Sequence, residues 1–434
     1  MPVETAVEGP ALYLCIDGGG TKTNVSIAGR RWGEKEVQIL GRGQHGSSNH
    51  TGVGVERAMR AIGEATMEAL RSLPDEEEFR VARSWRYNDD EEGSSADRSC
   101  SATPARRPGA PQTAAPFAKI WAGLSGVDGP QDLRLVRPAL ASLFGLSPPY
   151  DHILRVTNDC DLLSSVIQRI YNDNHLAPES STPCMGGIVL IAGTGSIATA
   201  FGPPSITSPP LGSSSIPHVL HALGRLGGYG YLLGDEGSSY YVGQQTIKQL
   251  LRFFDRHQEP RPFLDTHRDP QVEQVRRPMG VDDQMIERSS LLKEVLAHFQ
   301  VHRLADLMAS IYSMPSEHER KLRIAGLSRL VMRAAFGDDE TTDPFARSIL
   351  QNAACRLSEL VEDLCNLYNL LPAHTVLCLG GGMWSYSQFR LLVLDTMRTK
   401  WNALWGWVET IDQPDQLAAI SLASNLPSST PPCN

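Results

Sequence analysis

Apolar and polar positions repeat along the chain with two different periods, and each period predicts a different kind of element. Short apolar runs at 12–16 and 188–191 each end in a glycine-rich turn, and a second run of strand-forming residues follows each turn. We therefore predict two β-hairpins. Their turns read Asp-Gly-Gly-Gly-Thr-Lys-Thr at 17–23 and Ala-Gly-Thr-Gly-Ser at 192–196.

A helical period follows the first hairpin. Residues 53–73 place Val55, Ile62 and Leu70 on one face, which predicts an amphipathic helix. Strands are expected at 118–124 and 153–156, with a helix between them over 131–144 that is kinked or divided at Pro138. This succession of hairpin, helix, strand, helix and strand is typical of an α/β domain.

The second hairpin opens a part richer in helices. We expect a helix from Ser238 or Ser239 to about 254, further helices over 290–370, a last strand at 375–379 and a helix at 417–424. Four segments lack either period: 41–50 is interpreted as a polar, glycine-rich loop, 74–116 and 203–222 as surface insertions, and 258–284 as loosely structured. The chain is expected to finish in a disordered tail.

Composition narrows the class of protein. A chain of 434 residues with 41% hydrophobic and 21% charged residues suits a globular protein of two domains. A net charge of −9 argues against binding to nucleic acid or an anionic membrane, and no apolar run is long enough to span a bilayer. Residues 1–10 do not resemble a signal peptide, and the eight scattered cysteines contain no Cys-x-x-Cys pair. We expect a reduced, cytoplasmic protein.

The two glycine turns are candidate phosphate sites, because backbone N–H groups at a hairpin tip can cradle an anion. Their order of strand, turn and strand differs from the strand, turn and helix of Rossmann and P-loop proteins. Asp17, at the end of the first strand, is placed to hold Mg²⁺ through water, although a plain β-turn also favours Asp and Gly.

Two further acidic positions are candidates for chemistry. Asp159 follows a predicted strand, where it could take a proton from an acceptor hydroxyl, or cap a helix instead, and Asp161 is its rival. Asp235 and Glu236 could bind sugar hydroxyls or a metal, or complement a helix dipole.

Two other patterns are weaker indications of a functional site. The triple glycine 380–382 could let the backbone approach an adenine ring, or could form a tight turn. His45 and His50 lack the third ligand that a metal site needs, so we expect none there.

Eight motifs in a fixed order nevertheless resemble one family. The chain is similar to the BadF/BadG/BcrA/BcrD ATPase-like family and, within it, to the N-acetylglucosamine kinases, which belong to the superfamily of sugar kinases, heat-shock chaperones and actin. The resemblance covers about 12–424. The motifs are DGGGTKT at 17–23, SSNH at 47–50, GLSG at 123–126, TND at 157–159, AGTGS at 192–196, GGYGYLLGDEGS at 227–238, IAG at 324–326 and CLGGG at 378–382.

The resemblance implies a two-lobed, actin-like ATPase fold of the α/β class, in which each lobe is a ribonuclease-H-like mixed sheet with flanking helices. We expect an N-terminal lobe at 1–175, a C-terminal lobe at 176–410, and a terminal segment at 411–434 whose helix packs back on the first lobe.

The resemblance also implies roles for particular residues. Asp159 would be the catalytic base and would contact the sugar. The remaining sugar-binding positions would be Asn49, Ser125, Ser196, Ile197, Gly228, Tyr229, Gly230 and Asp235. ATP would be bound by Gly19, Gly20, Thr21, Lys22, Thr23, Gly193, Thr194, Gly195, Gly326, Gly381 and Gly382.

The implied activity is ATP-dependent phosphorylation of N-acetylglucosamine at its 6-OH, with ATP and Mg²⁺ as cofactors. A homodimer is one assembly compatible with the resemblance. Glucosamine, N-acetylmuramate or glucose are alternative acceptors. A dehydratase-activating ATPase would need cysteines that bind an iron–sulfur cluster, and the scattered cysteines argue against it. A sugar sensor without activity would be expected to lose the carboxylate that Asp159 supplies.

Overall fold

The computed structural model describes residues 10–34, 36–87, 115–176, 183–203, 220–257, 283–337 and 342–424. The chain divides into two compact units. The first comprises residues 1–169 and 413–434, and the second comprises 170–412. In the described part of the chain, no helix combines the length and apolarity needed to cross a membrane.

The first unit is built on a five-stranded sheet in the order β3-β2-β1-β4-β5. Strands β1, β2 and β3 are antiparallel neighbours, whereas β4 and β5 run parallel to β1. The strands are β1 Leu12–Gly18, β2 Thr23–Gly29, β3 Gln38–His45, β4 Phe117–Leu124 and β5 Leu154–Thr157.

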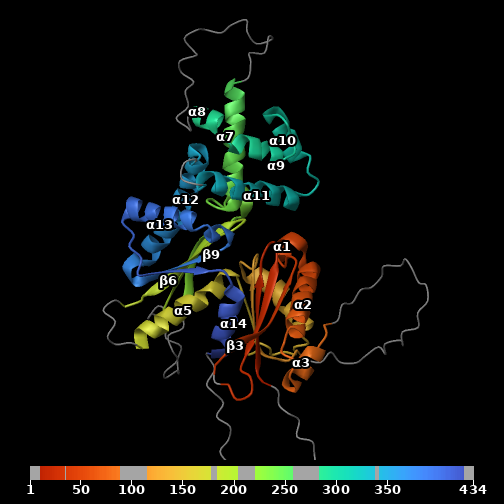
Figure 1. The fold of residues 1–434 in the computed structure, drawn as a ribbon. Helices are drawn as coiled ribbons and strands as arrows, with labels where there is room; N and C mark the ends of the chain where they lie inside the picture. Colours follow the sequence, from red (N-terminus) through yellow and green to blue (C-terminus); the bar gives the residue numbers. More distant parts are fainter. Residues whose placement is uncertain are drawn as a thin grey trace, which may run out of the picture. The chain divides into compact units, whose positions relative to one another are not determined.

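Helices cover both faces of this sheet (Figure 1). Helix α2 packs on β2 and β3, and α14 packs on β1 and β2. The helices of this unit are α1 His50–Val53, α2 Val55–Arg71, α3 Arg80–Ser84, α4 Pro130–Leu143, the start of α5 Cys160–Leu176, and α14 Pro414–Ser424, with a 3₁₀ turn at Glu77–Phe79. The predicted division at Pro138 is wrong, because α4 runs through this exposed proline as one helix.

The glycine-rich segment 41–50, predicted to be a loop, contains most of strand β3. A Cβ on Gly43 would lie 2.0 Å from the Ala65 carbonyl oxygen, and one on Gly41 would lie 2.4 Å from that of Ala69. Helix α2 can therefore approach β3 only because these positions lack side chains.

The predicted insertion at 74–116 is likewise partly wrong. Its beginning forms the 3₁₀ turn and α3, because Phe79 and Trp85 are buried in the core and Trp85 stacks on Phe144. Residues 88–114 lie outside the described residues, as do 204–219, 258–282 and 425–434.

The second unit repeats the same sheet. Its order, read from the edge hairpin strand, is β8-β7-β6-β9-β10, with an antiparallel β6, β7 and β8 and a parallel β9 and β10. The strands are β6 Gly186–Ala192, β7 Ser196–Gly202, β8 His221–Gly227, β9 Thr375–Gly380 and β10 Trp407–Ile411. Two such mixed sheets with flanking helices confirm the predicted ribonuclease-H-like α/β fold.

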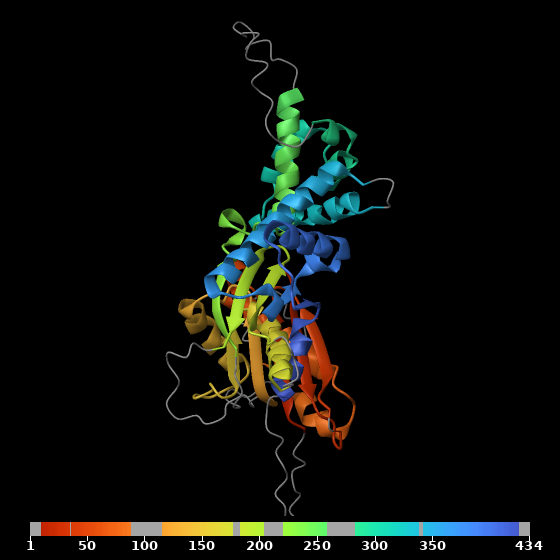
Figure 2. The ribbon, with the colours of Figure 1, turned by 90° about the vertical axis from the view of Figure 1, so that its left-hand side faces the viewer.

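The helices of this unit form one continuous core with the sheet. Helix α12 packs on the hairpin strands, and α7 packs across α11 and also contacts α10 (Figures 1 and 2). The helices are α6 Gly230–Leu233, α7 Ser239–His257, α8 Asp283–Arg288, α9 Leu291–His298, α10 Leu304–Tyr312, α11 Glu317–Ala335, α12 Pro344–Tyr368 and α13 Ser387–Trp401, with 3₁₀ turns at Pro372–His374 and Gly382–Ser385.

Candidate functional site

The carboxyl ends of β1, β4 and β5 are level with one another. Asp17 pairs with Gly123, and Gly123 pairs with Thr157, in two adjacent parallel ladders. Residues that follow these three strands therefore lie along one edge of the first sheet, which is where ligands bind in open α/β sheets.

The first hairpin ends in a turn closed by a 2.9 Å hydrogen bond from the Gly19 N–H to the Lys22 carbonyl. Gly19 and Gly20 lie in this turn, where Thr21 and Lys22 are exposed. Thr23 differs, since its buried hydroxyl hydrogen-bonds to the Gly46 carbonyl oxygen at 2.7 Å and to the Ser48 hydroxyl at 2.8 Å. The side chain of Thr23 thus anchors the loop that follows β3.

Two carboxylates, those of Asp17 and Asp159, influence one another at this edge. Burial raises the pKa of Asp17 to about 7, and the neighbouring Asp159 and Asp415 add to this rise. Burial also raises the pKa of Asp159 to about 6, although one of its oxygens accepts a 3.0 Å hydrogen bond from the Cys160 N–H. Burial raises the pKa of Asp161, the rival position, and the nearby cation of Arg155 partly opposes this rise.

This pair of carboxylates could both accept a proton and bind a cation. A carboxylate whose pKa lies near neutral pH is a more effective proton acceptor than an ordinary one. Concentrated negative charge in a poorly solvated place also favours a divalent cation. Within the described residues, no group of three or more His, Cys, Asp or Glu side chains could hold a metal ion. A cation here would therefore need oxygen ligands from water or phosphate.

Asn49 and Ser125 are brought together in the first unit. The Asn49 Nδ2 lies 3.4 Å from the Ser125 hydroxyl. The other side of the amide is fixed, because Oδ1 accepts from the Thr51 N–H at 3.1 Å and from its hydroxyl at 2.6 Å, which caps α1. The two predicted sugar-binding residues thus form one polar cluster.

The second hairpin is held by the loop that contains Asp235. Its turn closes with a 2.9 Å hydrogen bond from the Gly193 N–H to the Gly195 carbonyl, and includes Thr194. The Ser196 N–H donates to the Asp235 carboxylate at 3.1 Å, while the Ser196 hydroxyl donates to the Glu236 carbonyl at 2.7 Å. Burial raises the pKa of Asp235.

The next loop, at 228–230, lies against the same hairpin. The Gly228 N–H donates to the Ser196 carbonyl at 2.9 Å, and a Cβ on Gly228 would lie 2.8 Å from the Ile197 side chain. Tyr229 is 58% exposed, and Gly230 begins α6.

Gly381 and Gly382 reach the base of the second hairpin from β9. Gly381 has φ of +103°, and a Cβ there would lie 2.6 Å from the Ala192 carbonyl oxygen. Only glycine combines this conformation with this close approach. The chain then passes through the 3₁₀ turn to Tyr386.

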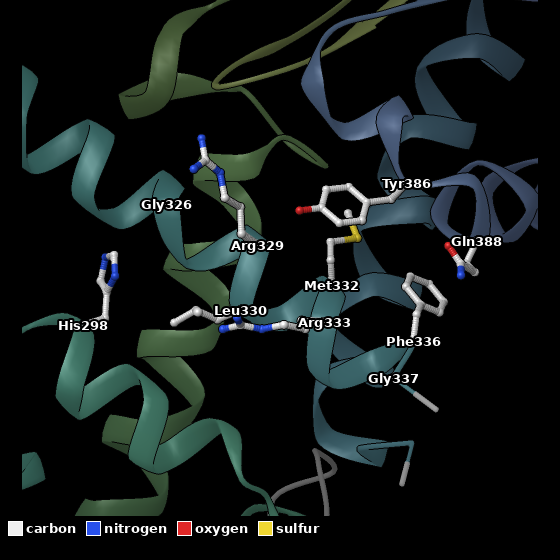
Figure 3. Close-up of a pocket in the computed structure, with 10 residues that line it drawn as sticks. All are labelled: His298, Gly326, Arg329, Leu330, Met332, Arg333, Phe336, Gly337, Tyr386 and Gln388. Atoms are coloured by element: carbon white, nitrogen blue, oxygen red, sulfur yellow. The ribbon is translucent and has the colours of Figure 1, made fainter. Parts of the chain in front are cut away.

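A pocket of about 590 Å³ lies close to that turn (Figure 3). Its walls come from the end of α9, from α11 and from Tyr386, whose ring points toward α11. Gly326 lies on α11 opposite His298, so that a Cβ there would lie 3.3 Å from the imidazole. The lining residues are His298, Gly326, Arg329, Leu330, Met332, Arg333, Phe336, Gly337, Tyr386 and Gln388.

Most of these lining residues were not predicted from the sequence. A usable signal was present, because Gly326, Arg329, Leu330 and Arg333 follow one another at the three- and four-residue spacing of a helix face. Apolar walls with two guanidinium groups and a volume of this size suit a small ligand with a flat ring.

Comparison with known proteins agrees with the motifs. The chain is 25% identical over 354 residues to an N-acetyl-D-glucosamine kinase of Dictyostelium discoideum, an alignment that covers 81% of this chain and 79% of the relative. It is 23% identical to an N-acetylmuramic acid/N-acetylglucosamine kinase of Clostridium acetobutylicum over 86% and 88% of the two chains. The chain is thus similar, over most of its length, to two curated sugar kinases. The resemblance to N-acetylglucosamine kinases is thereby confirmed, and the class of enzyme is that of the phosphotransferases.

Solved structures give more distant matches. A Porphyromonas gingivalis protein named as a candidate N-acetylglucosamine kinase is 17% identical, with a TM-score of 0.49 over 95% of this chain and 99% of that one. A Streptomyces griseus glucokinase in complex with glucose and AMPPNP is 13% identical, with a TM-score of 0.43 over 96% and 99%. No family model matches the sequence.

Proposed function

We propose that the protein transfers the γ-phosphoryl group of ATP to the 6-OH of N-acetyl-D-glucosamine, giving N-acetylglucosamine 6-phosphate and ADP. One observation carries this proposal: in a chain similar to sugar kinases, the half-buried carboxylate of Asp159, with a pKa of about 6, lies beside Asp17 at the edge of a ribonuclease-H-like sheet where ligands bind. In the cytoplasm, this reaction would serve amino-sugar salvage.

The first unit would supply Asn49, Ser125 and Asp159 to the acceptor sugar. Asn49 and Ser125 would hydrogen-bond to sugar hydroxyls, since the two side chains form one polar cluster. The 6-oxygen would attack the γ-phosphorus while its proton passes to the Asp159 oxygen that does not accept from Cys160. In the second unit, Ser196, Ile197, Gly228–Gly230 and Asp235 would contact the sugar and its N-acetyl group.

The phosphates of ATP would be bound by the two hairpin turns, at Gly19–Lys22 and Gly193–Gly195, with Thr23 supporting the first turn. The adenosine would occupy the pocket lined by Gly326, beside the Gly381–Gly382 turn. Mg²⁺ would be held by Asp17 through water, and it would neutralise charge on the transferred group. The pair of carboxylates, Asp17 and Asp159, fits such a cation because burial and neighbouring acidic groups raise both pKa values, and the cation of Lys22 opposes this effect only in part at Asp17.

N-acetylmuramate is the acceptor to test beside N-acetylglucosamine, because the Clostridium relative is described as acting on both. Glucosamine and glucose differ at C2 and probe the N-acetyl contacts. A dehydratase-activating ATPase is a weaker alternative, since both curated relatives are kinases.

The test is a coupled ADP-release assay on these four sugars, with NMR of the product to find the esterified oxygen. We expect the highest kcat/KM for N-acetylglucosamine and a phosphate on O6. Asp159→Asn should lower kcat at least 10³-fold while the protein remains folded. Sugar-independent ATP hydrolysis with no sugar phosphate formed would refute the proposal.

A further inference from the structure

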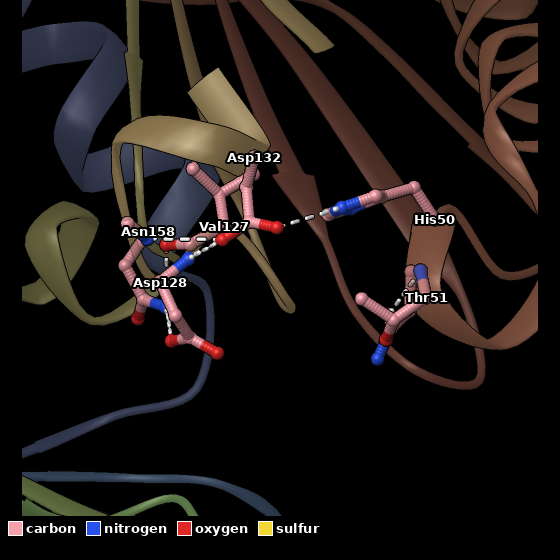
Figure 4. Close-up of polar contacts among 8 residues, drawn as sticks. His50, Thr51, Val127, Asp128, Asp132 and Asn158 are labelled. Carbon is pink, nitrogen blue, oxygen red and sulfur yellow. Dashed lines mark hydrogen bonds and ion pairs between the residues drawn. The ribbon is translucent and has the colours of Figure 1, made fainter. Parts of the chain in front are cut away.

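A buried histidine lies directly beside the predicted sugar ligand Asn49. His50 is the first residue of α1 and only 7% exposed. Its Nε2 faces the Asp132 carboxylate at 3.5 Å, as Figure 4 shows. Its Nδ1 is also buried and has no hydrogen-bond partner among the described residues. Burial of such a side chain is costly, so the contact with Asp132 is the interaction that compensates for it.

Asp132 uses its second oxygen for the turn that begins α4. This oxygen accepts from the Asp128 N–H at 3.1 Å and from the Gly129 N–H at 3.0 Å. Hydrogen bonds from these backbone groups, with a smaller effect of His50, lower the pKa of Asp132. The carboxylate is therefore ionised and connects α1 to this turn.

The same turn also holds Asn158, the residue before Asp159. The Asn158 Nδ2 donates to the Val127 carbonyl and to the Asp128 carboxylate, both at 3.2 Å. Its Oδ1 accepts from the Cys160 N–H at 3.1 Å, and Cys160 is the residue whose N–H also binds Asp159. Figure 4 shows these contacts following one another from His50 to Asn158.

We propose that Asp132 is a positioning residue, which fixes Asn49 relative to Asp159 through His50 on one side and Asn158 on the other. The proposal rests on the proposed function, in which Asn49 binds the sugar and Asp159 takes its proton. Phosphoryl transfer depends chiefly on the alignment of acceptor and donor. A loosened link should therefore affect the sugar and the rate, and leave nucleotide binding unchanged.

The variants are Asp132→Asn and His50→Phe, alone and together. The amide of Asp132→Asn can still accept from the two backbone N–H groups, so the turn should persist while the charge facing His50 is lost. A matched control is Asp151→Asn, which removes the ion pair between Asp151 and Arg137 on the same helix α4.

We expect each single variant to lower kcat/KM for the sugar 10- to 50-fold and to leave KM for ATP within twofold. The double variant should be no worse than the poorer single variant, because both remove one link. The control should behave as the wild type. Multiplicative losses in the double variant, equal effects on both substrates, or activity within twofold of wild type would overturn the proposal.

Hydrogen exchange separates this inference from the proposed function. Asp132→Asn should speed exchange at least fivefold in both 48–54 and 158–162, compared with the control variant, whether or not any sugar is phosphorylated. Faster exchange in an enzyme that phosphorylates no hexose would remove the proposed function and leave the link in place. Unchanged exchange in either segment would refute the link itself.

Discussion

Replacement of Asp17 by Asn should stabilise the protein in the absence of ligands, and more so at high pH. A carboxyl whose pKa is about 7 in the folded state, against 3.8 for the ordinary group, binds its proton more tightly when folded. Its contribution to stability is therefore complete below pH 4 and is lost as the pH rises to about 7. The loss amounts to about 4 kcal/mol in all, of which about 2.5 kcal/mol falls between pH 5 and 8.5.

The assay is hydrogen exchange of the β1 and β4 amides in moderate urea, without divalent cations, at several pH values between 5 and 8.5. The opening free energy of Asp17→Asn minus that of wild type should grow by about 2–3 kcal/mol over this range. Asp395→Asn, which replaces an exposed carboxylate on α13, should show no such trend. A difference that stays constant with pH would refute the argument that burial beside Asp159 and Asp415 strains this carboxylate.

Three further outcomes are expected. The kcat/KM of wild type should fall as the pH drops through about 6, since Asp159 must be ionised to accept a proton; a rate unchanged down to pH 5 would remove Asp159 as the base. Gly381→Ala should raise KM for ATP at least 10-fold and leave KM for the sugar unchanged, because its Cβ would lie 2.6 Å from the Ala192 carbonyl oxygen. A KM for ATP equal to that of the wild type would contradict this. Phe79→Ala should lower the unfolding free energy by about 3–5 kcal/mol in denaturant titrations, because Phe79 is fully buried, and a change below 1 kcal/mol would place this turn outside the core.

Periodicity predicted the strands that carry the two hairpins and failed for strands built from small or polar residues. The glycines of β3 indicate a loop in the sequence, because glycine usually marks turns. Its glycines serve instead the close packing of α2, which depends on tertiary contacts that no local window contains. Strand β8 was missed for a related reason, since it alternates poorly and three of its seven residues are exposed. Strand β10, at the other edge, is only five residues long.

The charged residues of 74–84 were a poor guide to its burial. Three consecutive glutamates at 76–78 indicated a solvated insertion, yet Phe79 follows them directly and Trp85 lies six residues further on. Two large aromatic side chains in a polar run are a signal of local burial, and the structure places both in the first core.

The candidate site could be predicted at the level of motifs but not of side-chain environments. The glycine turns and Asp159 follow strands that periodicity indicates, whereas Asn49 follows β3 and was found only through its SSNH motif. The contact of Asn49 with Ser125 spans 76 positions of the sequence, and the pKa of Asp17 depends on Asp415, which is almost 400 positions away. Such effects arise only once the first sheet is assembled.

The first unit is discontinuous in the sequence, and this has a consequence for its biosynthesis. Cys15, Ala28 and Trp121 are buried against Ala418 and Ala419 of α14, which the ribosome produces after the whole second unit. Until then, one face of the first sheet lacks its covering helix and remains open to aggregation or chaperones. The unit that carries Asp17 and Asp159 can therefore reach its final form only after α14 has been synthesised.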